Sequence, residues 1–287
     1  MSAQVFNGKI IIQELRAQIA EEVEQLTKQG VRPGLAVILV GDDPASHVYV
    51  RNKEKACEQV GIYSEVHRLP KETAQDELIA LIEKLNADPN IHGLLVQSPP
   101  PEHIDERAVI DAIAVYKDVD GFHPTNVGNL VLGGAEAFVA CTPFGVMELI
   151  RRTGMEVAGK HAVVVGRSHI VGKPMAMLLL QENATVTICH SKTRNLAEIT
   201  SQADILVVAV GKPKLIRREH VKPGAVVIDV GMNRLPDGKL CGDVDFDDCL
   251  EVAGHITPVP GVVGPMTITM LLRNTVESAK RTLAARS

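Results

Sequence analysis

A strand-like apolar run that ends in a glycine turn, within residues 160–174 (KHAVVVGRSHIVGKP), constrains the possible folds of this chain more than any other segment. Residues 162–165 form a short, apolar, valine-rich segment, which is typical of a buried strand. The run ends at Gly166, and we expect a helix to begin near Val171. A strand, a tight glycine turn and a helix N-terminus form the phosphate-binding corner of dinucleotide folds, because free backbone N–H groups face the anion there.

The glycine spacing of this corner departs from the common Gly-x-Gly-x-x-Gly, because Ser168 replaces the second glycine. Taken alone, the corner favours nucleotide binding, and an ordinary strand-to-helix turn of an α/β protein is the alternative.

The next predicted strand, residues 185–190, indicates which nucleotide the corner would bind. NAD enzymes usually place an Asp or Glu about 20 residues after the glycine turn, on the ribose hydroxyls. Here the strand is followed instead by Ser191, Lys192, Thr193 and Arg194. A carboxylate would repel a 2′-phosphate, whereas hydroxyls and cations bind one, and Arg can do so bidentately. The segment favours NADP over NAD, with a solvated polar turn as the alternative.

The composition is that of a soluble globular protein with two domains or one large one: 287 residues, 45% hydrophobic and 23% charged. A net charge of −5, no tryptophan and 3% aromatic residues argue against a nucleic-acid partner. The N-terminus lacks a signal pattern, and the longest uncharged stretch, residues 254–272, contains three prolines, so no membrane association is expected. Five cysteines without a Cys-x-x-Cys motif fit reduced thiols in the cytoplasm, and the histidines show no metal-ligand pairing, so no metal is expected.

Helical and strand-like patterns alternate along the chain, which predicts a mainly parallel sheet in the first half as well. We expect helices over residues 8–29, 45–60, 74–86, 105–114, 142–152 and 267–284. The expected strands, besides those named above, are residues 35–40, 63–69, 93–97, 205–210, 225–230 and 255–257. Residues 117–134 are predicted to be a polar linker between the halves, and residues 261–265 a turn-rich loop.

Tyr49 and Lys53 stand four residues apart in the helix predicted over residues 45–60, so both project from one face of it. The helix follows the end of a predicted strand, where α/β folds place their sites. Spacing alone does not separate this from a solvated helix face, on which Tyr–Lys pairs are common.

Five motifs in one order carry a resemblance to a known family. They are Y-x-x-x-K at residues 49–53, VQSPPP at 96–101, KDVDGFHPTNVG at 117–128, GRSHIVGKP at 166–174 and TPVPGVVGPMT at 257–267. Together, over nearly the whole chain, they resemble the bacterial type of the bifunctional methylenetetrahydrofolate dehydrogenase/methenyltetrahydrofolate cyclohydrolase family.

The resemblance implies two α/β domains with a cleft between them. The first, residues 1–139 joined by a C-terminal helix at 266–287, would carry the substrate on a mainly parallel sheet. The second, residues 140–265, would be a Rossmann-like NADP-binding domain. A homodimer is also implied.

The implied reaction has two steps. NADP⁺ takes a hydride from 5,10-methylenetetrahydrofolate, and water opens the methenyl product to 10-formyltetrahydrofolate. By position, Lys53 resembles the catalytic lysine, Gln97 the amide that holds it, Tyr49 the aromatic that packs on the folate, and Asp120 the carboxylate that binds the pterin. The positions that match cofactor contacts are Gly166, Arg167, Ser168, Ser191 and Met232.

The chemical properties of these residue types also suit the implied reaction. A carboxylate such as Asp120 accepts well from the N–H donors of a pterin edge. Hydride transfer depends more on positioning of the reactants than on an acid or base. Hydration and ring opening move protons, so they require an acid or base. The alternatives are an NADP-dependent dehydrogenase of another small substrate, of the shikimate type, and a non-catalytic nucleotide sensor.

Two places depart from the family pattern. Ser98 and Pro100 stand where the family usually has leucines, in V-Q-L-P-L-P, and Val262 stands where it usually has the second glycine after P-V-P. If that glycine requires a positive φ, Val262 would be strained.

Overall fold

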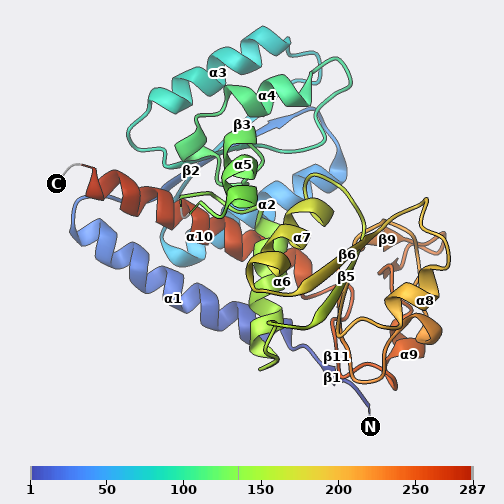
Figure 1. Ribbon diagram of the computed structural model, residues 1–287. Coiled ribbons are helices and arrows are strands. Elements are labelled where there is room, and N and C mark those ends of the chain that lie inside the picture. Colours follow the sequence, from blue (N-terminus) through green and yellow to red (C-terminus); the bar gives the residue numbers. More distant parts are fainter. Residues whose placement is uncertain (1, 135, 286–287) are drawn as a thin grey trace. The chain divides into compact units, whose positions relative to one another are not determined.

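The computed structural model describes residues 2–134 and 136–285, which form two compact units (Figure 1). The six-stranded unit contains the described residues of 1–12 and 142–267. The three-stranded unit contains those of 13–141 and 268–287.

The three-stranded unit is built on a parallel sheet in the order β3-β2-β4. Its strands are β2 (Gly34–Val40), β3 (Tyr63–Leu69) and β4 (Gly93–Val96). Its helices are α2 (Pro44–Val60), α3 (Gln75–Ala87), α4 (Glu106–Ala112), the short η1 (Val115–Lys117) and α5 (Pro124–Leu132), together with most of α1 (Gly8–Lys28) and α10 (Val263–Ala284).

Helix α2 begins directly beyond the carboxyl end of β2 because its first residues fit a helix start. The Asp43 carboxylate accepts a hydrogen bond from the Ser46 N–H at 2.7 Å, and Pro44 occupies the first turn, where no N–H is required. The helix ends at Gly61, whose φ of 82° is the left-handed conformation that glycine adopts without strain. These signals set the helix bounds that the sequence predicts.

The core of this unit forms where helix α3 packs on the sheet. Every residue of β2 is buried, and Ile38 belongs to one hydrophobic cluster with Leu78, Ile82 and Leu85 of α3. Burial of the whole strand explains why β2 reads as a continuous apolar run and not as an alternating pattern.

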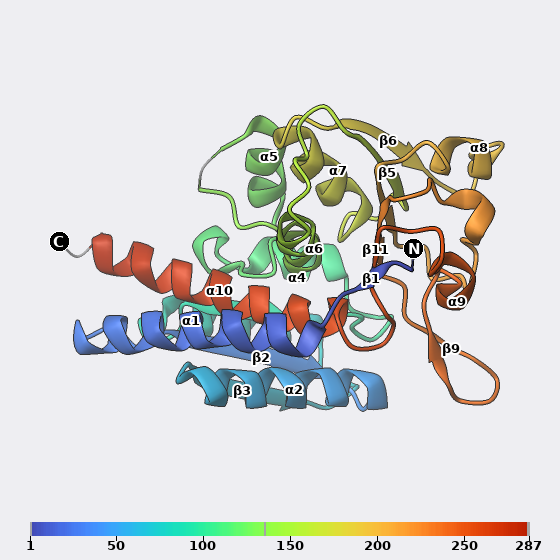
Figure 2. The same cartoon turned by 90° about the horizontal axis from the view of Figure 1, so that it is seen from below.

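Helices α1 and α10 lie side by side in the three-stranded unit (Figures 1 and 2). Lys280 forms an ion pair with Glu22 at 2.6 Å, and Arg16 Nε donates to Thr269 Oγ1 at 3.3 Å. Buried Asn274 of α10 donates to the backbone carbonyl oxygen of Val119 at 2.8 Å. Helix α10 thereby holds the backbone immediately before Asp120.

The six-stranded unit contains a parallel sheet in the order β1-β11-β8-β7-β5-β6. Its strands are β1 (Gln4–Val5), β5 (His161–Val165), β6 (Thr185–Cys189), β7 (Ile205–Val208), β8 (Val226–Asp229) and β11 (His255–Ile256). A small hairpin joins β9 (Asn233–Arg234) to β10 (Leu240–Cys241), and the helices are α6 (Cys141–Arg152), α7 (Gly172–Gln181), α8 (Leu196–Thr200), η2 (Arg218–His220) and α9 (Phe246–Cys249).

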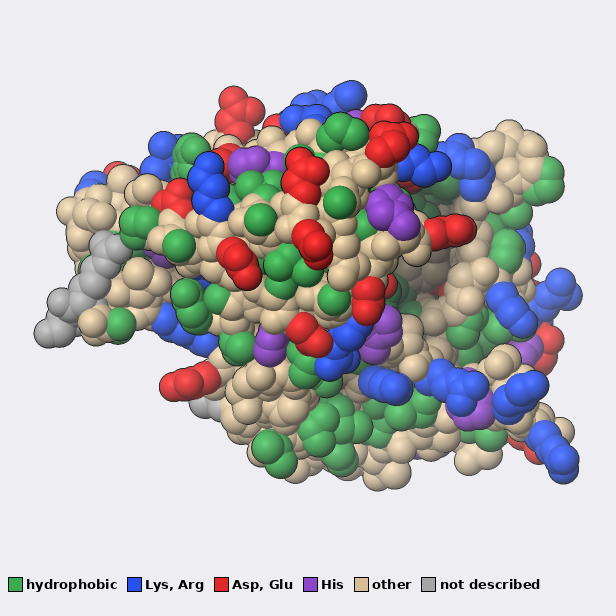
Figure 3. Space-filling model, turned by 90° about the horizontal axis from the view of Figure 1, so that it is seen from above, with side chains coloured by type: hydrophobic (Ala, Val, Ile, Leu, Met, Phe, Trp, Pro, Cys, Tyr) green, Lys and Arg blue, Asp and Glu red, His purple; other side chains and the backbone are tan. Residues whose placement is uncertain are grey.

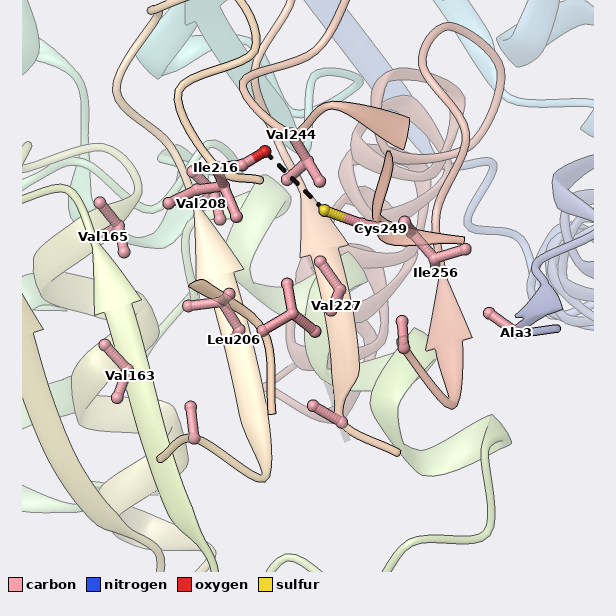
Figure 4. Close-up of a cluster of buried hydrophobic side chains, with 14 of the residues drawn as sticks. Ala3, Val163, Val165, Leu206, Val208, Ile216, Val227, Val244, Cys249 and Ile256 are labelled. Atoms are coloured by element: carbon pink, nitrogen blue, oxygen red, sulfur yellow. Dashed lines mark hydrogen bonds between the residues drawn. The ribbon is translucent and has the colours of Figure 1, made fainter. Parts of the chain in front are cut away.

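Alternate residues of the central strands form the core of the six-stranded unit (Figure 4). Val163 and Val165 of β5, Leu206 and Val208 of β7 and Val227 of β8 are all buried in one cluster. Strand β5 lies between β6 and β7, so the chain leaves it first to one side and then to the other. This switch point in the strand order is where open α/β sheets bind ligands, and Gly166 follows it directly.

Three predictions about local structure are wrong. Residues 117–134 are not a linker, because they contain α5 and belong to the three-stranded unit. Helix α10 begins at Val263, inside the predicted loop. Residues 2–12 belong to the six-stranded unit and not to the first domain, because β1 pairs with β11.

The expected strain at Val262 is also absent. The positive φ of this turn belongs to Gly261, at 124°, and Val262 has none. The Val262 side chain is buried, and its Cγ2 lies 3.0 Å from where a β-carbon on Gly8 would be. The glycine at position 8 leaves the room that Val262 occupies.

A buried carboxylate, Asp229, closes the end of β8. It accepts hydrogen bonds from the backbone N–H groups of Gly231, Asp243 and Val244 at 2.8–3.0 Å. Burial raises the pKa of Asp229 from its usual 3.8 to about 7, although these three donors act in the opposite direction.

This raised pKa predicts a pH-dependent stability. The folded state holds the Asp229 proton more tightly than the unfolded state, so the stabilisation is complete below about pH 4 and is lost as the pH rises through about 7. The side chain of Asp229→Asn cannot titrate, so the denaturant midpoint of this variant should fall less than that of the parent between about pH 4 and 7, where one group contributes up to about 1.4 kcal/mol per pH unit. Asp247→Asn, at an exposed carboxylate, is the control. Parallel pH profiles for the parent and Asp229→Asn would contradict the prediction.

Candidate functional site

Lys53 of α2 is a buried lysine at the carboxyl edge of the three-stranded sheet, with only 8% of its surface exposed. Its Nζ donates a hydrogen bond to Gln97 Oε1 at 3.1 Å. Gln97 directly follows β4, and its backbone N–H bonds to the Ile38 carbonyl oxygen of β2 at 2.8 Å. Because both strands run in parallel, the residue after β4 reaches the helix that follows β2. The structure therefore brings together two predicted site residues that are 44 positions apart.

The amide of Gln97 has its own anchor. Its Nε2 donates to the Ser98 carbonyl oxygen at 2.8 Å, which leaves Oε1 facing the lysine. An amide held in this way accepts from an ammonium without adding a negative charge.

Asp120 is a half-buried carboxylate that interacts electrostatically with Lys53. Burial is the main cause that raises the pKa of Asp120, and the nearby Asp118 carboxylate raises it further, whereas the positive charge of Lys53 opposes the shift. Lys53, Gln97 and Asp120 therefore belong to one polar cluster.

Asp118 supports this cluster, and the sequence reasoning missed it. Its buried carboxylate accepts from the N–H groups of Phe122 and His123, at 3.2 and 2.8 Å, and from Asn126 Nδ2 at 2.8 Å. These bonds curl the chain around Asp120. The signal was present as Asp-x-Asp-Gly, and Gly121 has the φ of 76° that the turn requires.

Tyr49 lies one helical turn before Lys53 on α2, and 36% of its surface is exposed. An exposed ring next to a buried polar cluster offers a flat surface on which a planar ligand can pack. The two departures Ser98 and Pro100 line a small apolar cavity with Asp120 and Phe122, so they border this same cluster.

In the six-stranded unit, the glycine corner after β5 has the close approaches that the sequence predicts. Gly166 has a φ of 138°, and a β-carbon there would lie 2.4 Å from the Ala209 carbonyl oxygen. A β-carbon on Gly172 would lie 2.3 Å from the Gly166 carbonyl oxygen. Helix α7 starts at Gly172, one residue beyond the expected position. Only glycines allow the helix start to sit this close to the strand end.

Ser168 hydrogen-bonds to the start of helix α7 in the structure. Its Oγ accepts from the N–H groups of Val171 at 3.1 Å and Gly172 at 3.3 Å. The serine that replaces the second glycine of the common motif thus orders the turn itself.

A cavity of about 370 Å³ opens beside this corner. Gly166, Arg167 and Ser191 line it, as do Lys212 and Thr193. Two cations and two hydroxyls, with no carboxylate among the described lining residues, suit a phosphate-bearing nucleotide. Sequence reasoning missed Lys212, although it follows a predicted strand at the same sheet edge.

Three residues considered at the sequence level lie elsewhere. Lys192 and Arg194 are not part of the described cavity lining, and neither is Met232. The Met232 side chain is 44% exposed, and its Cε lies 3.7 Å from where a β-carbon on Gly264 would be.

The surface carries both signs of charge. On the face in Figure 3, Lys and Arg side chains are interspersed with Asp and Glu side chains. Within residues 2–134 and 136–285, no helix has the length and apolar character that a membrane crossing requires.

Comparison with known proteins identifies the family. A model of the tetrahydrofolate dehydrogenase/cyclohydrolase catalytic domain matches residues 6–120, and a model of the NAD(P)-binding domain of the same enzymes matches residues 140–283. The chain is 63% identical over 281 residues to the bifunctional protein FolD of Moorella thermoacetica, a match that covers 98% of this chain and 100% of that protein.

Solved structures agree with this match. The bifunctional enzyme FolD of Campylobacter jejuni, a methylenetetrahydrofolate dehydrogenase/cyclohydrolase, superposes with a TM-score of 0.96 at 49% identity, covering 98% of this chain and 99% of that one. The FolD of Trypanosoma brucei, solved with NADP cofactor and an inhibitor, superposes with a TM-score of 0.94 at 41% identity over 100% of both chains. The polar cluster around Lys53, the glycine corner and these matches lead to one conclusion: the chain belongs to the tetrahydrofolate dehydrogenase/cyclohydrolase family.

Proposed function

We propose that this chain oxidises 5,10-methylenetetrahydrofolate to the 5,10-methenyl form with NADP⁺ and hydrolyses that product to 10-formyltetrahydrofolate. The observation that carries the proposal is the buried Lys53, held by Gln97 and electrostatically coupled to Asp120. A cluster of a proton carrier, an anchor and a carboxylate suits a substrate that both binds through N–H groups and exchanges protons.

The six-stranded unit would hold the cofactor. The glycine corner of Gly166 and Gly172 provides the close backbone approach that a pyrophosphate needs, and Arg167, Ser191 and Lys212 line the adjoining cavity. Bound NADP⁺ supplies the acceptor for the hydride. We include two further residues in the cofactor site: Ser168, whose Oγ orders the glycine corner, and Met232, as a backbone contact near the end of β8.

Asp120 and Tyr49 would orient the folate. The half-buried Asp120 carboxylate accepts N–H groups from the pterin edge, which fixes the direction of the ring system. The exposed ring of Tyr49 packs on the flat pterin or on the adjoining aromatic ring. Together they position the methylene carbon, which is what hydride transfer requires.

Lys53 would carry the proton in the hydrolytic step. Water adds to the methenyl carbon and releases a proton, and the bond from that carbon to N5 then breaks. The remaining hydroxyl loses its proton to solvent as it becomes the carbonyl of the formyl group, which stays on N10, and N5 takes up a proton. An amine at Lys53, oriented by Gln97, can accept the proton that water first releases and deliver it to N5.

The proposal also includes a homodimer, which the resemblance implies, and a cytoplasmic location, which the five cysteines without a Cys-x-x-Cys motif favour. The rival functions, oxidation of another small substrate and nucleotide sensing, are separated by one assay. Mixing the protein with NADP⁺ and methylenetetrahydrofolate should produce NADPH and the absorbance of the methenyl product. Cofactor binding without this turnover would support a sensor.

The first prediction from this site concerns the 2′-phosphate. Replacing Arg167 and Ser191 by Ala should raise KM for NADP⁺ much more than KM for NAD⁺, because only NADP⁺ carries the group that they would bind. Steady-state kinetics with both cofactors checks this. Lys239→Ala, at an exposed lysine of the same unit outside the described lining, is the control and should change neither value strongly. Equal use of the two cofactors by the parent protein would refute the assignment.

A second prediction concerns the pterin contact. Asp120→Ala should weaken folate binding by about 1–3 kcal/mol, roughly 5- to 150-fold, because pterin donors would lose their acceptor. NADP⁺ binding should stay unchanged, and titration calorimetry measures both affinities. Exposed Asp111→Ala is the control. Unchanged folate affinity in Asp120→Ala would remove this residue from the site.

The third prediction separates the two activities. Lys53→Met keeps the apolar stem of the side chain but removes the titrating nitrogen. Methenyl hydrolysis should therefore fall by roughly 10²–10⁴-fold, as on loss of a positioned acid or base. Hydride transfer should fall less, because it needs no proton at this place.

Lys53→Arg and Lys55→Met complete this test. Arg keeps the charge but stays protonated, so it should not restore hydrolysis. Lys55 is exposed on the same helix, and its replacement should leave both activities near the parent level. Parallel losses in the two reactions, with Arg restoring both, would show that Lys53 acts only through its charge.

A further inference from the structure

Asp243 is a buried carboxylate in the six-stranded unit, located two residues after the β9–β10 hairpin. Its Oδ2 accepts from the backbone N–H groups of Val210 at 2.7 Å and Gly211 at 2.9 Å. Its Oδ1 accepts from the Lys212 N–H at 2.8 Å and from Asn233 Nδ2 at 2.9 Å. Four donors occupy the four acceptor positions of an ionised carboxylate.

Three of these donors are consecutive backbone groups of one turn, which follows β7. Val210 and Lys212 of that turn line the 370 Å³ cavity together with Arg167 and Ser191. The carboxylate of Asp243 therefore holds one wall of the cavity in place from behind. Without it, three adjacent N–H groups of this turn would lose their acceptor.

Asp243 is itself fixed by Asp229. The Asp243 backbone N–H donates to Asp229 Oδ1 at 3.0 Å. A β-carbon on Gly231 would lie 2.2 Å from Asp243 Cγ, and one on Gly242 would lie 1.8 Å from Asp229 Oδ2. The two carboxylates thus fill space that two glycines leave open, and the packing gives Asp243 little freedom to move.

The charge of Asp243 is balanced by hydrogen-bond donors and not by a cation. Among the described residues, none of the ion pairs involves Asp243. Backbone N–H groups that donate to Asp243 hold the turn, and Lys212, one of these donors, is also a lining residue of the cavity. Lys212 therefore connects the buried Asp243 carboxylate, to which its backbone N–H donates, with the cavity that it lines.

We propose that Asp243 is a positioning residue for NADP⁺, acting through residues 210–212 to place Lys212 in the cavity that Arg167 and Ser191 line. The inference rests on the proposed function only in taking NADP⁺ as the ligand. The phosphate that Lys212 meets can be the 2′-phosphate or the pyrophosphate, and comparison of NADP⁺ with NAD⁺ distinguishes them.

Asp243→Asn tests the proposal with little change in volume. The amide nitrogen cannot accept, so in either orientation two of the four donors lose their partner. We expect the Kd for NADP⁺ to rise by roughly tenfold or more. An equal rise for NAD⁺ assigns Lys212 to the pyrophosphate, and a smaller rise for NAD⁺ assigns it to the 2′-phosphate.

Methenyl hydrolysis measured without cofactor is the internal control, because its proposed residues lie in the three-stranded unit. It should stay within about twofold of the parent, whereas a general loss of structure would lower it. Asp247→Asn, which removes an exposed carboxylate close by in the sequence, should change neither measurement. If the parent bound NADP⁺ but lacked hydrolysis, the proposed function would fail, and the NADP⁺ titrations would still test Asp243.

Lys212→Met and the double variant test the link itself. If Asp243 acts through Lys212, the double variant should bind NADP⁺ no more weakly than Asp243→Asn alone. Asn233→Ala removes one donor and should give an intermediate loss, which keeps the test valid if Asp243→Asn fails to fold. The proposal would be overturned if Lys212→Met or folded Asp243→Asn bound NADP⁺ as tightly as the parent. Additive losses of affinity in the double variant would also overturn it.

Discussion

Parallel strand pairing is the constraint on which both sites of this protein depend. In a parallel sheet all carboxyl ends lie at one edge, so residues that follow different strands meet there. In the three-stranded unit this brings Gln97, after β4, to Lys53 on the helix that follows β2. In the six-stranded unit it brings Gly166, after β5, to Ala209, after β7. Neither meeting requires the residues to be near each other in the sequence.

Buried carboxylates organise the loops at these edges. Asp118, Asp229 and Asp243 each accept at least three hydrogen bonds, mostly from backbone N–H groups. Removing such a charge from water costs several kcal/mol, and each hydrogen bond to a charged group returns about 1.5–3 kcal/mol. A loop that satisfies the carboxylate is therefore strongly favoured over one that does not. The loops gain a defined shape without regular secondary structure.

The two units divide the chemistry. The residues proposed for the folate and for proton transfer all belong to the three-stranded unit, and those that line the nucleotide cavity all belong to the six-stranded unit. Substitutions in one unit can therefore be judged against an activity assigned to the other. Helices α1 and α10 each contain residues of both units. The units are therefore defined by which residues pack together, and neither unit is one continuous stretch of the chain.

The sequence by itself determined the fold class, most helix and strand bounds, the glycine corner and the five motifs that identify the family. These features are local: strand runs, caps such as Asp43 and Gly61, and close-approach glycines act within a few residues, so their pattern is visible in the chain. The prediction of a linker at residues 117–134 was wrong because proline and glycine are common in loops as well as at helix ends. Here Pro124 begins α5 and Gly133 ends it. Only the tertiary structure decided that Asp243 supports the cavity wall, that Lys212 joins the cavity and that β1 completes the six-stranded sheet. Each of these depends on contacts between distant segments, whose geometry is set by strand order and burial and leaves no periodic trace in the sequence.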